Sequence, residues 1–359
     1  MKKVLVILPC ISLANGVSAY ALNYYNNINA DNIKFDFVVV KESDKKLYEK
    51  FEKNGSKVFE IIKKNESFIK YILKIKNFIK NVANDYDIIH SHVYNSGAFF
   101  LFFSKLYGIN MRILHSHATV SSDVLSHRII NSFLIPIAKY SANKYCACSI
   151  KAGNFLFKNK KFDVINNAID MNKYEFNNID RERYKKELGL ENKFVIGNIG
   201  RLCKQKNQEM LLDIFKGIYL NDENVRLLII GDGVLEKELK EKVEKLNIKN
   251  GVIFLGARND VNKLYNVMDV FVLTSLYEGL PVVGIEAQIN GIPCVFSDSI
   301  TKEVKIGNNV QFISLKDKKE KWIDAILRYK DKKRISISKL DCDYDIAIEA
   351  EKLERIYEE

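Results

Sequence analysis

Short runs of apolar, mostly β-branched residues alternate with segments of helical periodicity along the whole chain. Most runs are continuously apolar, which is typical of parallel strands covered by helices on both faces. Strands are predicted at 3–8, 35–40, 88–91, 112–115, 144–148 and 163–165, and then at 194–199, 226–230, 252–255, 270–273, 294–296 and 310–313. Strands alternating with helices indicate βαβ units, so the expected class is doubly wound α/β.

Two sets of about six strands predict two Rossmann-like domains, as does a length of 359 residues at about 150 per domain. The apolar periodicity gives way to a polar, Asn-rich stretch between Asn166 and Asn192. We therefore assign residues 1–166 to an N-terminal domain and 167–340 to a C-terminal one. Open α/β sheets bind ligands outside the carboxyl ends of their strands, so we expect the site in a cleft where both sheets present those ends.

The net charge of +11 favours anionic partners: phosphates, an acidic membrane surface or nucleic acid. No helix-turn-helix, zinc-finger or aromatic-basic signature accompanies it, so nucleic acid is not an expected partner. No apolar run reaches the roughly 18 residues of a membrane span. The apolar start, Val4–Leu8, is too short for a signal peptide and predicts a first strand, and we expect a cytoplasmic protein.

Two cations lie between a predicted strand and a predicted helix in the segment Asn198–Gln208. Arg201 and Lys206 follow the strand that ends near Ile199, and a helix begins near Asn207. A guanidinium fork, an ammonium group and a helix N-terminus can together hold a diphosphate. The spacing alone is equally consistent with two solvated loop cations.

A second strand-to-helix segment, Thr274–Glu286, carries two glutamates with seven residues between them. Glu278 lies in the loop, Pro281 suits a first helical turn, and Glu286 lies more than a turn further on. Two carboxylates so placed can accept hydrogen bonds from two parts of one elongated sugar ligand. Glu278 alone can also be an acid that complements a helix dipole.

Taken together, these two segments resemble the retaining GT-B nucleotide-sugar glycosyltransferases of family four, in particular the bacterial capsular and exopolysaccharide enzymes. Supporting segments extend the likeness over essentially the whole chain: His90-Ser91-His92, Ile113–His117, Val164–Asp170 and Gly231-Asp232-Gly233. The resemblance implies two Rossmann-like domains facing a central cleft. It also implies a final helix, within about 341–359, that packs back on the N-terminal domain.

The resemblance implies a role for each matching residue in the C-terminal half. Arg201 and Lys206 would neutralise the donor diphosphate. Glu286 would bind the ribose, and Glu278 the transferred sugar, helped by the backbone of Gly279 and Leu280. The main chain near Arg258 would meet the nucleobase.

Two N-terminal positions complete the implied donor site. His117 would touch the donor sugar, with His115 as the alternative, and Gly16 would let the donor approach the backbone. Many relatives carry paired glycines where this chain has Asn15-Gly16. Because asparagine tolerates positive φ, we expect the turn to be preserved.

The implied reaction moves a hexosyl or N-acetylhexosaminyl unit from a UDP-sugar to a lipid-linked intermediate in capsule or exopolysaccharide biosynthesis. Cations and helix amides can stabilise the departing diphosphate, so no metal or other cofactor is expected. Two alternatives remain: a non-catalytic partner subunit of glycosyltransferase type, and a sugar-nucleotide epimerase of GT-B architecture.

Two further features allow two interpretations each. His90 and His92 can line the acceptor side of the cleft or be structural, and a zinc site shared with His115 and His117 lacks a supporting carboxylate or thiol spacing. The lysine-rich segment 61–80 fits an amphipathic helix on the first sheet with a solvated basic face. It equally fits a helix docked peripherally on the anionic inner leaflet of the cell membrane, where each lysine adds about 1 kcal/mol.

Overall fold

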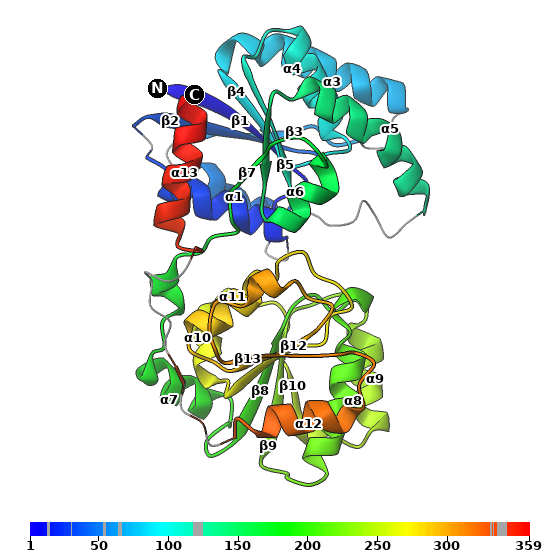
Figure 1. Ribbon diagram of the computed structural model, residues 1–359, viewed down its shortest axis with the longest axis vertical. Helices are drawn as coiled ribbons and strands as arrows, with labels where there is room; N and C mark the ends of the chain where they lie inside the picture. The colour runs from blue at the N-terminus through cyan, green and yellow to red at the C-terminus, as the bar shows by residue number, and fades with distance from the viewer. Residues whose placement is uncertain are drawn as a thin grey trace. The chain divides into compact units, whose positions relative to one another are not determined.

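The chain divides into two compact units in a computed structural model (Figure 1). The structure describes residues 1–12, 15–29, 31–52, 55–63, 67–117, 125–330, 332, 334–335 and 343–359. The N-terminal unit comprises Met1–Ala168 and Asp343–Glu359, and the C-terminal unit comprises Ile169–Cys342. The chain therefore crosses from one unit to the other near Ala168 and returns at Asp343.

The N-terminal unit is built on a seven-stranded parallel sheet of order β3-β2-β1-β4-β5-β6-β7. Its strands are β1 (Lys2–Leu8), β2 (Ile33–Val39), β3 (Val58–Glu60), β4 (Ile88–Ser91), β5 (Met111–Ser116), β6 (Lys144–Ala147) and β7 (Asp163–Val164). Its helices are α1 (Gly16–Asn27), α2 (Tyr48–Glu52), α3 (Phe68–Val82), α4 (Gly97–Leu106), α5 (Leu125–Ser141), α6 (Ile150–Phe157) and α13 (Ile346–Glu358). The sequence predicted every strand of this sheet except β3.

β3 was missed because it lies at the sheet edge and has only three residues. Its side chains are exposed or half-buried, so the segment has no continuous apolar run. Edge strands need less apolar surface than central strands, which are covered on both faces.

The C-terminal unit repeats the plan with a six-stranded parallel sheet of order β10-β9-β8-β11-β12-β13. Its strands are β8 (Phe194–Ile199), β9 (Val225–Ile230), β10 (Val252–Phe254), β11 (Val270–Leu273), β12 (Cys294–Ser297) and β13 (Val310–Ile313). Its helices are α7 (Asn178–Glu187), α8 (Gln208–Tyr219), α9 (Glu236–Lys245), α10 (Val261–Leu264), α11 (Val282–Ile289) and α12 (Lys319–Leu327). Both sheets have the doubly wound order, which confirms the predicted fold class.

Helices cover both faces of the N-terminal sheet, and the strand residues alternate between two apolar cores. Leu5 and Ile7 of β1 pack in the core beneath α3, α4, α5 and α6. Val4 and Val6 point the other way, into the core beneath α1 and α13. This alternation follows from the two-residue period of a strand.

The final helix, α13, is an integral part of the N-terminal unit. It packs beside α1, and its Leu353 and Tyr357 belong to the same apolar core as the α1 tyrosines. Glu349 is fully buried, and its carboxylate accepts a hydrogen bond from the backbone N–H of Asn166 at 2.8 Å. Lys2 Nζ donates to the carbonyl oxygen of Tyr357 at 2.6 Å, which brings the two ends of the chain together (Figure 1).

Candidate active site

The strand order reverses between β8 and β11 in the C-terminal sheet. At such a switch point the loops after the two strands diverge and leave a crevice outside their carboxyl ends. The loop after β8 carries Arg201 and Lys206, and the loop after β11 carries Glu278. The fold therefore brings together the two segments that the sequence singled out.

Close backbone approaches shape the loop after β8. Gly231 has φ +133°, and a Cβ there would lie 2.2 Å from the carbonyl oxygen of Gly200. Gly233 has φ +156°, and its Cβ would lie 2.4 Å from the carbonyl oxygen of Leu202. Only glycine fits such contacts, so Gly231-Asp232-Gly233 serves to support the loop that carries Arg201.

Lys206 and Glu278 form an ion pair. Lys206 Nζ lies 2.6 Å from Glu278 Oε1, and the side chains are only 14% and 9% exposed. Ser275 Oγ donates to the same carboxylate oxygen at 2.8 Å, and Gln205 Nε2 donates to the other at 3.3 Å. These contacts fix the orientation of Glu278 before any ligand arrives.

The two loops are also joined by hydrogen bonds from a side chain of each loop to a carbonyl oxygen of the other. Asn207 adopts the left-handed conformation (φ +53°), and its side-chain amide donates to the carbonyl oxygen of Thr274 at 3.0 Å. Thr274 Oγ1 in turn donates to the carbonyl oxygen of Asn207 at 2.9 Å. The expected helix start is correct, but the Asn207 side chain does not cap α8; it bridges to the neighbouring loop instead.

Arg201 is exposed, and among the described residues its guanidinium forms no ion pair. Its carbonyl oxygen accepts a hydrogen bond from Gln208 Nε2 at 3.0 Å, which anchors the backbone while leaving the side chain in solvent. A guanidinium without a protein carboxylate is free to bind a phosphate.

Glu286 lies on α11 and is buried, with Tyr265 donating its hydroxyl proton to Oε2 at 2.7 Å. Burial raises the pKa of Glu286, and hydrogen bonds from Tyr265 and Tyr174 partly oppose that rise. Gly279 and Leu280 precede Pro281, the residue before the first turn of α11. The sequence did not single out either tyrosine, because each comes from a short helical turn far from Glu286 in the chain.

Arg258 is held by its neighbour rather than left open. Its guanidinium donates two hydrogen bonds to the Asp260 carboxylate, at 2.8 and 2.6 Å. The hydrogen bond with Asp260 raises the pKa of Arg258. Tyr184 donates its hydroxyl proton to the same carboxylate at 2.9 Å. This side chain is therefore occupied, which leaves the main chain for the role predicted near Arg258.

In the N-terminal unit, Gly16 is the first residue of α1. A Cβ at Gly16 would meet no atom of the described residues within 4 Å, so these residues leave the backbone there open to a ligand. Asn15 has φ −102°, and its side-chain oxygen accepts hydrogen bonds from the N–H groups of Val17 and Ser18. The turn thus depends on Asn15 as a helix cap and not, as expected, on its tolerance of positive φ.

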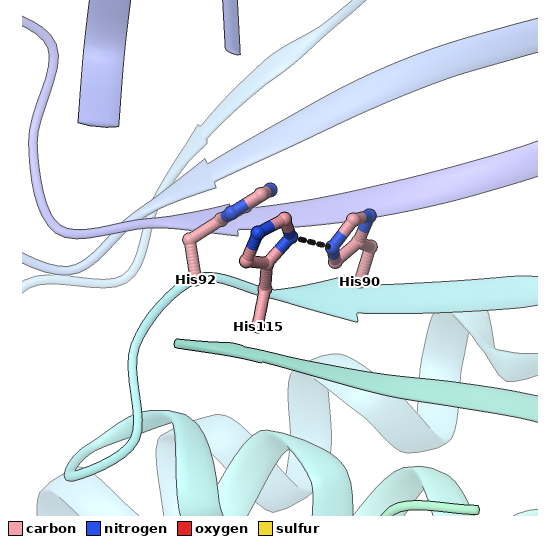
Figure 2. A group of neighbouring side chains, drawn as sticks. All are labelled: His90, His92 and His115. Carbon is pink, nitrogen blue, oxygen red and sulfur yellow. Dashed lines mark hydrogen bonds between the residues drawn. The ribbon is translucent and has the colours of Figure 1, made fainter. Parts of the chain in front are cut away.

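Four histidines form an array at the carboxyl ends of β4 and β5, on the sheet face beneath α1 and α13. Figure 2 shows three of them, His90, His92 and His115. His90 Nε2 lies 3.0 Å from His115 Nδ1, and His92 Nδ1 lies 2.7 Å from His117 Nε2. The hydroxyl of Tyr357 on α13 lies 2.7 Å from His90 Nδ1. The histidines are thus paired with one another and connected to the final helix.

Burial keeps the array uncharged. Desolvation lowers the pKa of His90 to about 3 and that of His117 to about 3, where a hydrogen bond to Asn167 partly opposes the shift. Desolvation and neighbouring histidines place the pKa of both His92 and His115 well below the ordinary value. Neutral imidazoles can donate and accept hydrogen bonds, which suits contact with sugar hydroxyls.

Three of the histidines lie close enough together for a shared metal ion to be considered. The ligand nitrogens of His90, His92 and His115 lie within 4.8 Å of one another. Their arrangement differs from a ligand set, because the rings of His90 and His115 are stacked with planes 12° apart and are hydrogen-bonded to each other (Figure 2). Metal ligands instead direct their lone pairs at one central point, so the donor geometry fits a hydrogen-bonded array better than a zinc site.

Two buried polar atoms in or beside this array have no hydrogen-bond partner among the described residues: the Tyr20 hydroxyl and His115 Nε2. Tyr20 packs on the rings of both His115 and His117. Buried polar atoms normally have partners, so unsatisfied ones mark a place where water or a ligand can bind. The N-terminal unit therefore has its own candidate binding region at the carboxyl edge of its sheet.

Comparison with known proteins identifies the family. Residues 180–339, which include the ion pair, match the model of the family described as Glycosyl transferases group 1. The chain is 30% identical over 293 residues to the UDP-Gal:alpha-D-GlcNAc-diphosphoundecaprenol alpha-1,3-galactosyltransferase of Escherichia coli, covering 78% of this chain and 76% of that protein. The chain belongs to the group 1 glycosyltransferases.

Two further comparisons extend the similarity, one in sequence and one in fold, over nearly the full length of the chain. The chain is 29% identical over 339 residues to the Bacillus subtilis (strain 168) protein named "Putative glycosyltransferase EpsF", covering 91% of this chain and 87% of that protein. The crystal structure of Anabaena Alr3699/HepE in complex with UDP and glucose superposes with a TM-score of 0.82 at 17% identity and 100% coverage of both chains. The likeness of this glycosyltransferase to that structure confirms the predicted GT-B fold.

Proposed function

We propose that the protein is a retaining, metal-independent glycosyltransferase that moves a hexosyl or N-acetylhexosaminyl unit from a UDP-sugar to a lipid-linked glycan in capsule or exopolysaccharide biosynthesis. The observation that carries the proposal is the Lys206–Glu278 ion pair at the switch point of the C-terminal sheet. The pair places a cation that can bind a diphosphate next to a carboxylate that can bind sugar hydroxyls. A nucleotide-sugar donor presents both of these groups.

In the proposed reaction, the bond between the anomeric carbon and the diphosphate oxygen breaks, and its electron pair stays on the diphosphate. Lys206 and the exposed Arg201 stabilise this developing negative charge. Both cations are already in position before the bond breaks, so no reorganisation is needed during the reaction. The acceptor hydroxyl forms the new bond on the same face of the sugar, and its proton passes to the departing phosphate oxygen. Configuration is thereby retained without a covalent enzyme intermediate.

The other residues of the proposed site bind and orient the substrates. Glu278 and the backbone of Gly279 and Leu280 hold the transferred sugar, Glu286 the ribose, and the main chain near Arg258 the base. His117 of the N-terminal unit contacts the donor sugar, where a neutral imidazole can hydrogen-bond without adding charge. Gly16 offers an open backbone to the donor.

The names of the relatives support the substrate classes. The Escherichia coli relative is named for transfer from UDP-Gal to a diphosphoundecaprenol-linked sugar, and the Anabaena structure contains UDP and glucose. We infer that this chain also uses a UDP-sugar and a polyprenyl-linked acceptor. Because such an acceptor lies in a membrane, we propose that the protein reaches it as a peripheral protein on the cytoplasmic leaflet. No helix among the described residues has the length and apolarity of a transmembrane span.

A transfer assay tests the proposal. Purified protein is incubated with a panel of UDP-sugars and detergent-solubilised polyprenyl-diphosphate sugars, in buffer with and without EDTA. We expect transfer with one donor, an α-linked product from an α-linked donor by NMR, and no loss of rate with EDTA. Donor binding without transfer or hydrolysis would favour a non-catalytic subunit, and inversion at the anomeric carbon would refute the retaining mechanism.

A further inference from the structure

Three neighbouring helices of the N-terminal unit, α3, α4 and α5, expose an unusual number of large apolar side chains. The three helices pack side by side, α4 against both others, on one face of the sheet (Figure 1). We call the surface formed by their exposed residues the α3–α5 face. Its apolar members are Phe68, Ile69, Leu73, Phe102, Leu106, Ile129, Ile130, Phe133 and Tyr140.

The clearest pattern lies on α5. Ile129, Phe133 and Tyr140 are 55%, 70% and 72% exposed, and the exposed Pro136 lies between the last two. These positions, at i, i+4, i+7 and i+11, form one stripe along the outer side of a helix. The opposite side of α5 already supplies Leu134 and Ala138 to the core. The helix is therefore apolar on two sides, and only the side with Leu134 and Ala138 is buried in the core.

The same excess occurs on the other two helices. On α3, Ile69 is 70% exposed and Leu73 is 48% exposed, although Tyr71, Ile75 and Ile79 already fill the core-facing side. On α4, Leu106 is 61% exposed. Clustered exposed apolar residues mark an interaction surface, whereas scattered ones do not.

The charge of these helices points to the occupant. They carry seven lysine or arginine residues (Lys70, Lys74, Lys76, Lys80, Lys105, Arg128 and Lys139) and no aspartate or glutamate. By contrast, α7 and α9 of the C-terminal unit mix both signs. A surface whose charged residues are all cations, next to protruding aliphatic and aromatic side chains, is complementary to a bilayer with anionic headgroups.

One contact joins a basic residue and an aromatic residue of the α3–α5 face. Lys105 Nζ on α4 lies 3.6 Å from the centre of the Tyr140 ring on α5 and donates to the Tyr140 carbonyl oxygen. An aromatic ring beside an ammonium group is the combination found at the headgroup level of membranes, where one end is apolar and the other is wet. A nucleic acid would use the cations but not the protruding apolar side chains.

We propose that the α3–α5 face docks on an anionic phospholipid bilayer, with the α5 stripe inserted at the headgroup–acyl boundary. This docking rests on the proposed function: a polyprenyl-linked acceptor lies in a bilayer, and docking brings the protein to it. It extends the membrane interpretation of segment 61–80 from one basic helix to a three-helix surface with an apolar centre.

Vesicle sedimentation tests the proposal. We expect the full chain to bind phosphatidylcholine–phosphatidylglycerol vesicles and to bind pure phosphatidylcholine vesicles much more weakly. Ile129→Ser/Phe133→Ser should weaken binding to the anionic vesicles by about tenfold or more, since affinity scales with inserted apolar area. The matched control is Ile179→Ser/Val234→Ser, two residues that are 78% and 87% exposed in the C-terminal unit, and it should bind like wild type.

Insertion can be read directly by fluorescence. The single native tryptophan, Trp322, is fully buried in the C-terminal unit, so it serves as an internal reference. In Phe133→Trp, lipids brominated on their acyl chains should quench the new tryptophan, whereas in Ile179→Trp they should not. No quenching of Phe133→Trp, or equal vesicle binding by the α5 variant and wild type, would overturn the proposal.

The two proposals fail separately. Transfer to a detergent-solubilised acceptor without vesicle binding would refute the α3–α5 face alone. Vesicle binding that depends on Phe133, without any sugar transfer, would refute the proposed function alone. Retention on DNA stronger than on anionic vesicles would assign the cations to nucleic acid and overturn the membrane assignment.

Discussion

Lys206 Nζ lies 2.6 Å from Glu278 Oε1, although 71 residues separate them and each follows a different strand of the C-terminal sheet. The pair is mostly shielded from water, which strengthens the attraction between the two opposite charges. An ammonium group has three N–H donors, so Lys206 can hold Glu278 and still donate to a phosphate oxygen. The pair is thus compatible with simultaneous recognition of a diphosphate and a sugar.

Substituting one or both members of this pair separates its contribution to stability from its contribution to donor binding. Lys206→Met leaves a buried carboxylate without its partner, and we expect the unfolding free energy to fall by about 3 kcal/mol. Lys206→Met/Glu278→Gln removes both charges and should recover most of that loss, as measured by urea unfolding. Calorimetric binding of the UDP-sugar should stay weaker by about tenfold or more in both variants. Wild-type affinity in the double variant would contradict the assigned diphosphate role.

The glycine loop gives a second prediction. Gly231→Ala places a Cβ against the Gly200 carbonyl, so the loop bearing Arg201 must shift. We expect donor binding to weaken about tenfold and stability to fall by about 2 kcal/mol. Gly189 also has positive φ (+63°), but its Cβ would meet no atom within 4 Å. Gly189→Ala should therefore cost about 1 kcal/mol of stability and leave UDP binding unchanged.

Burial of Glu286 makes the stability of the C-terminal unit depend on pH. Because its pKa is raised in the folded state, the folded protein keeps this proton to higher pH than the unfolded chain. The unfolding free energy therefore decreases as pH rises from about 4.5 through the raised value, and it stays lower above that. Glu286→Gln should lack this decrease, which urea unfolding across pH can show.

The same substitution tests ribose binding. An amide is a weaker acceptor than a carboxylate, so we expect Glu286→Gln to bind UDP about tenfold more weakly at pH 7.5. Tyr265→Phe, which removes a neighbouring donor but keeps the carboxylate, serves as the control and should affect UDP binding less. Unchanged UDP affinity in Glu286→Gln would exclude the ribose role.

The histidine array predicts acid sensitivity of the N-terminal unit. Its members have lowered pKa values when folded, so on unfolding below pH 6.5 they take up protons. Stability is therefore fully present above pH 6.5 and is lost progressively toward pH 3, with a slope of about 1 kcal/mol per pH unit for each histidine. His92→Gln/His117→Gln should reduce that slope.

The distribution of probes separates the two units in this experiment. All five histidines precede residue 128, whereas Trp322 lies in the C-terminal unit. Between pH 7 and 5, the urea midpoint seen by far-ultraviolet circular dichroism should fall more than the midpoint seen by Trp322 fluorescence. Equal shifts at both probes would show that the histidines are not responsible.

The two arginines of the C-terminal unit should behave differently. Arg258 is held by Asp260, so Arg258→Ala should change UDP-sugar affinity by less than about threefold if only its main chain contacts the base. Arg201 forms no ion pair with a described residue, and Arg201→Ala should weaken binding by about tenfold or more without loss of stability. Isothermal titration of both variants checks the pair, and a reversed order would exchange the proposed roles.

Both sheets were predictable because parallel strands covered on both faces must be continuous apolar runs. That requirement is absent at the edge, where β3 is short and half-exposed, and the sequence did not reveal it. The segments bearing Arg201, Lys206, Glu278 and Glu286 were predictable from their position after buried strands. Their partners Gln205, Ser275 and Tyr265 were not, because hydrogen bonds between loops leave no periodic pattern.

By itself, the sequence determined the alternation of strands and helices and the order of charged residues in the loops, since burial and helical periodicity are local properties of the chain. Only the tertiary structure decided that Lys206 pairs with Glu278, that Tyr357 meets His90, and that α3, α4 and α5, which carry the lysines and exposed apolar residues, pack side by side. These relationships depend on strand order and helix packing, which join residues far apart in the chain.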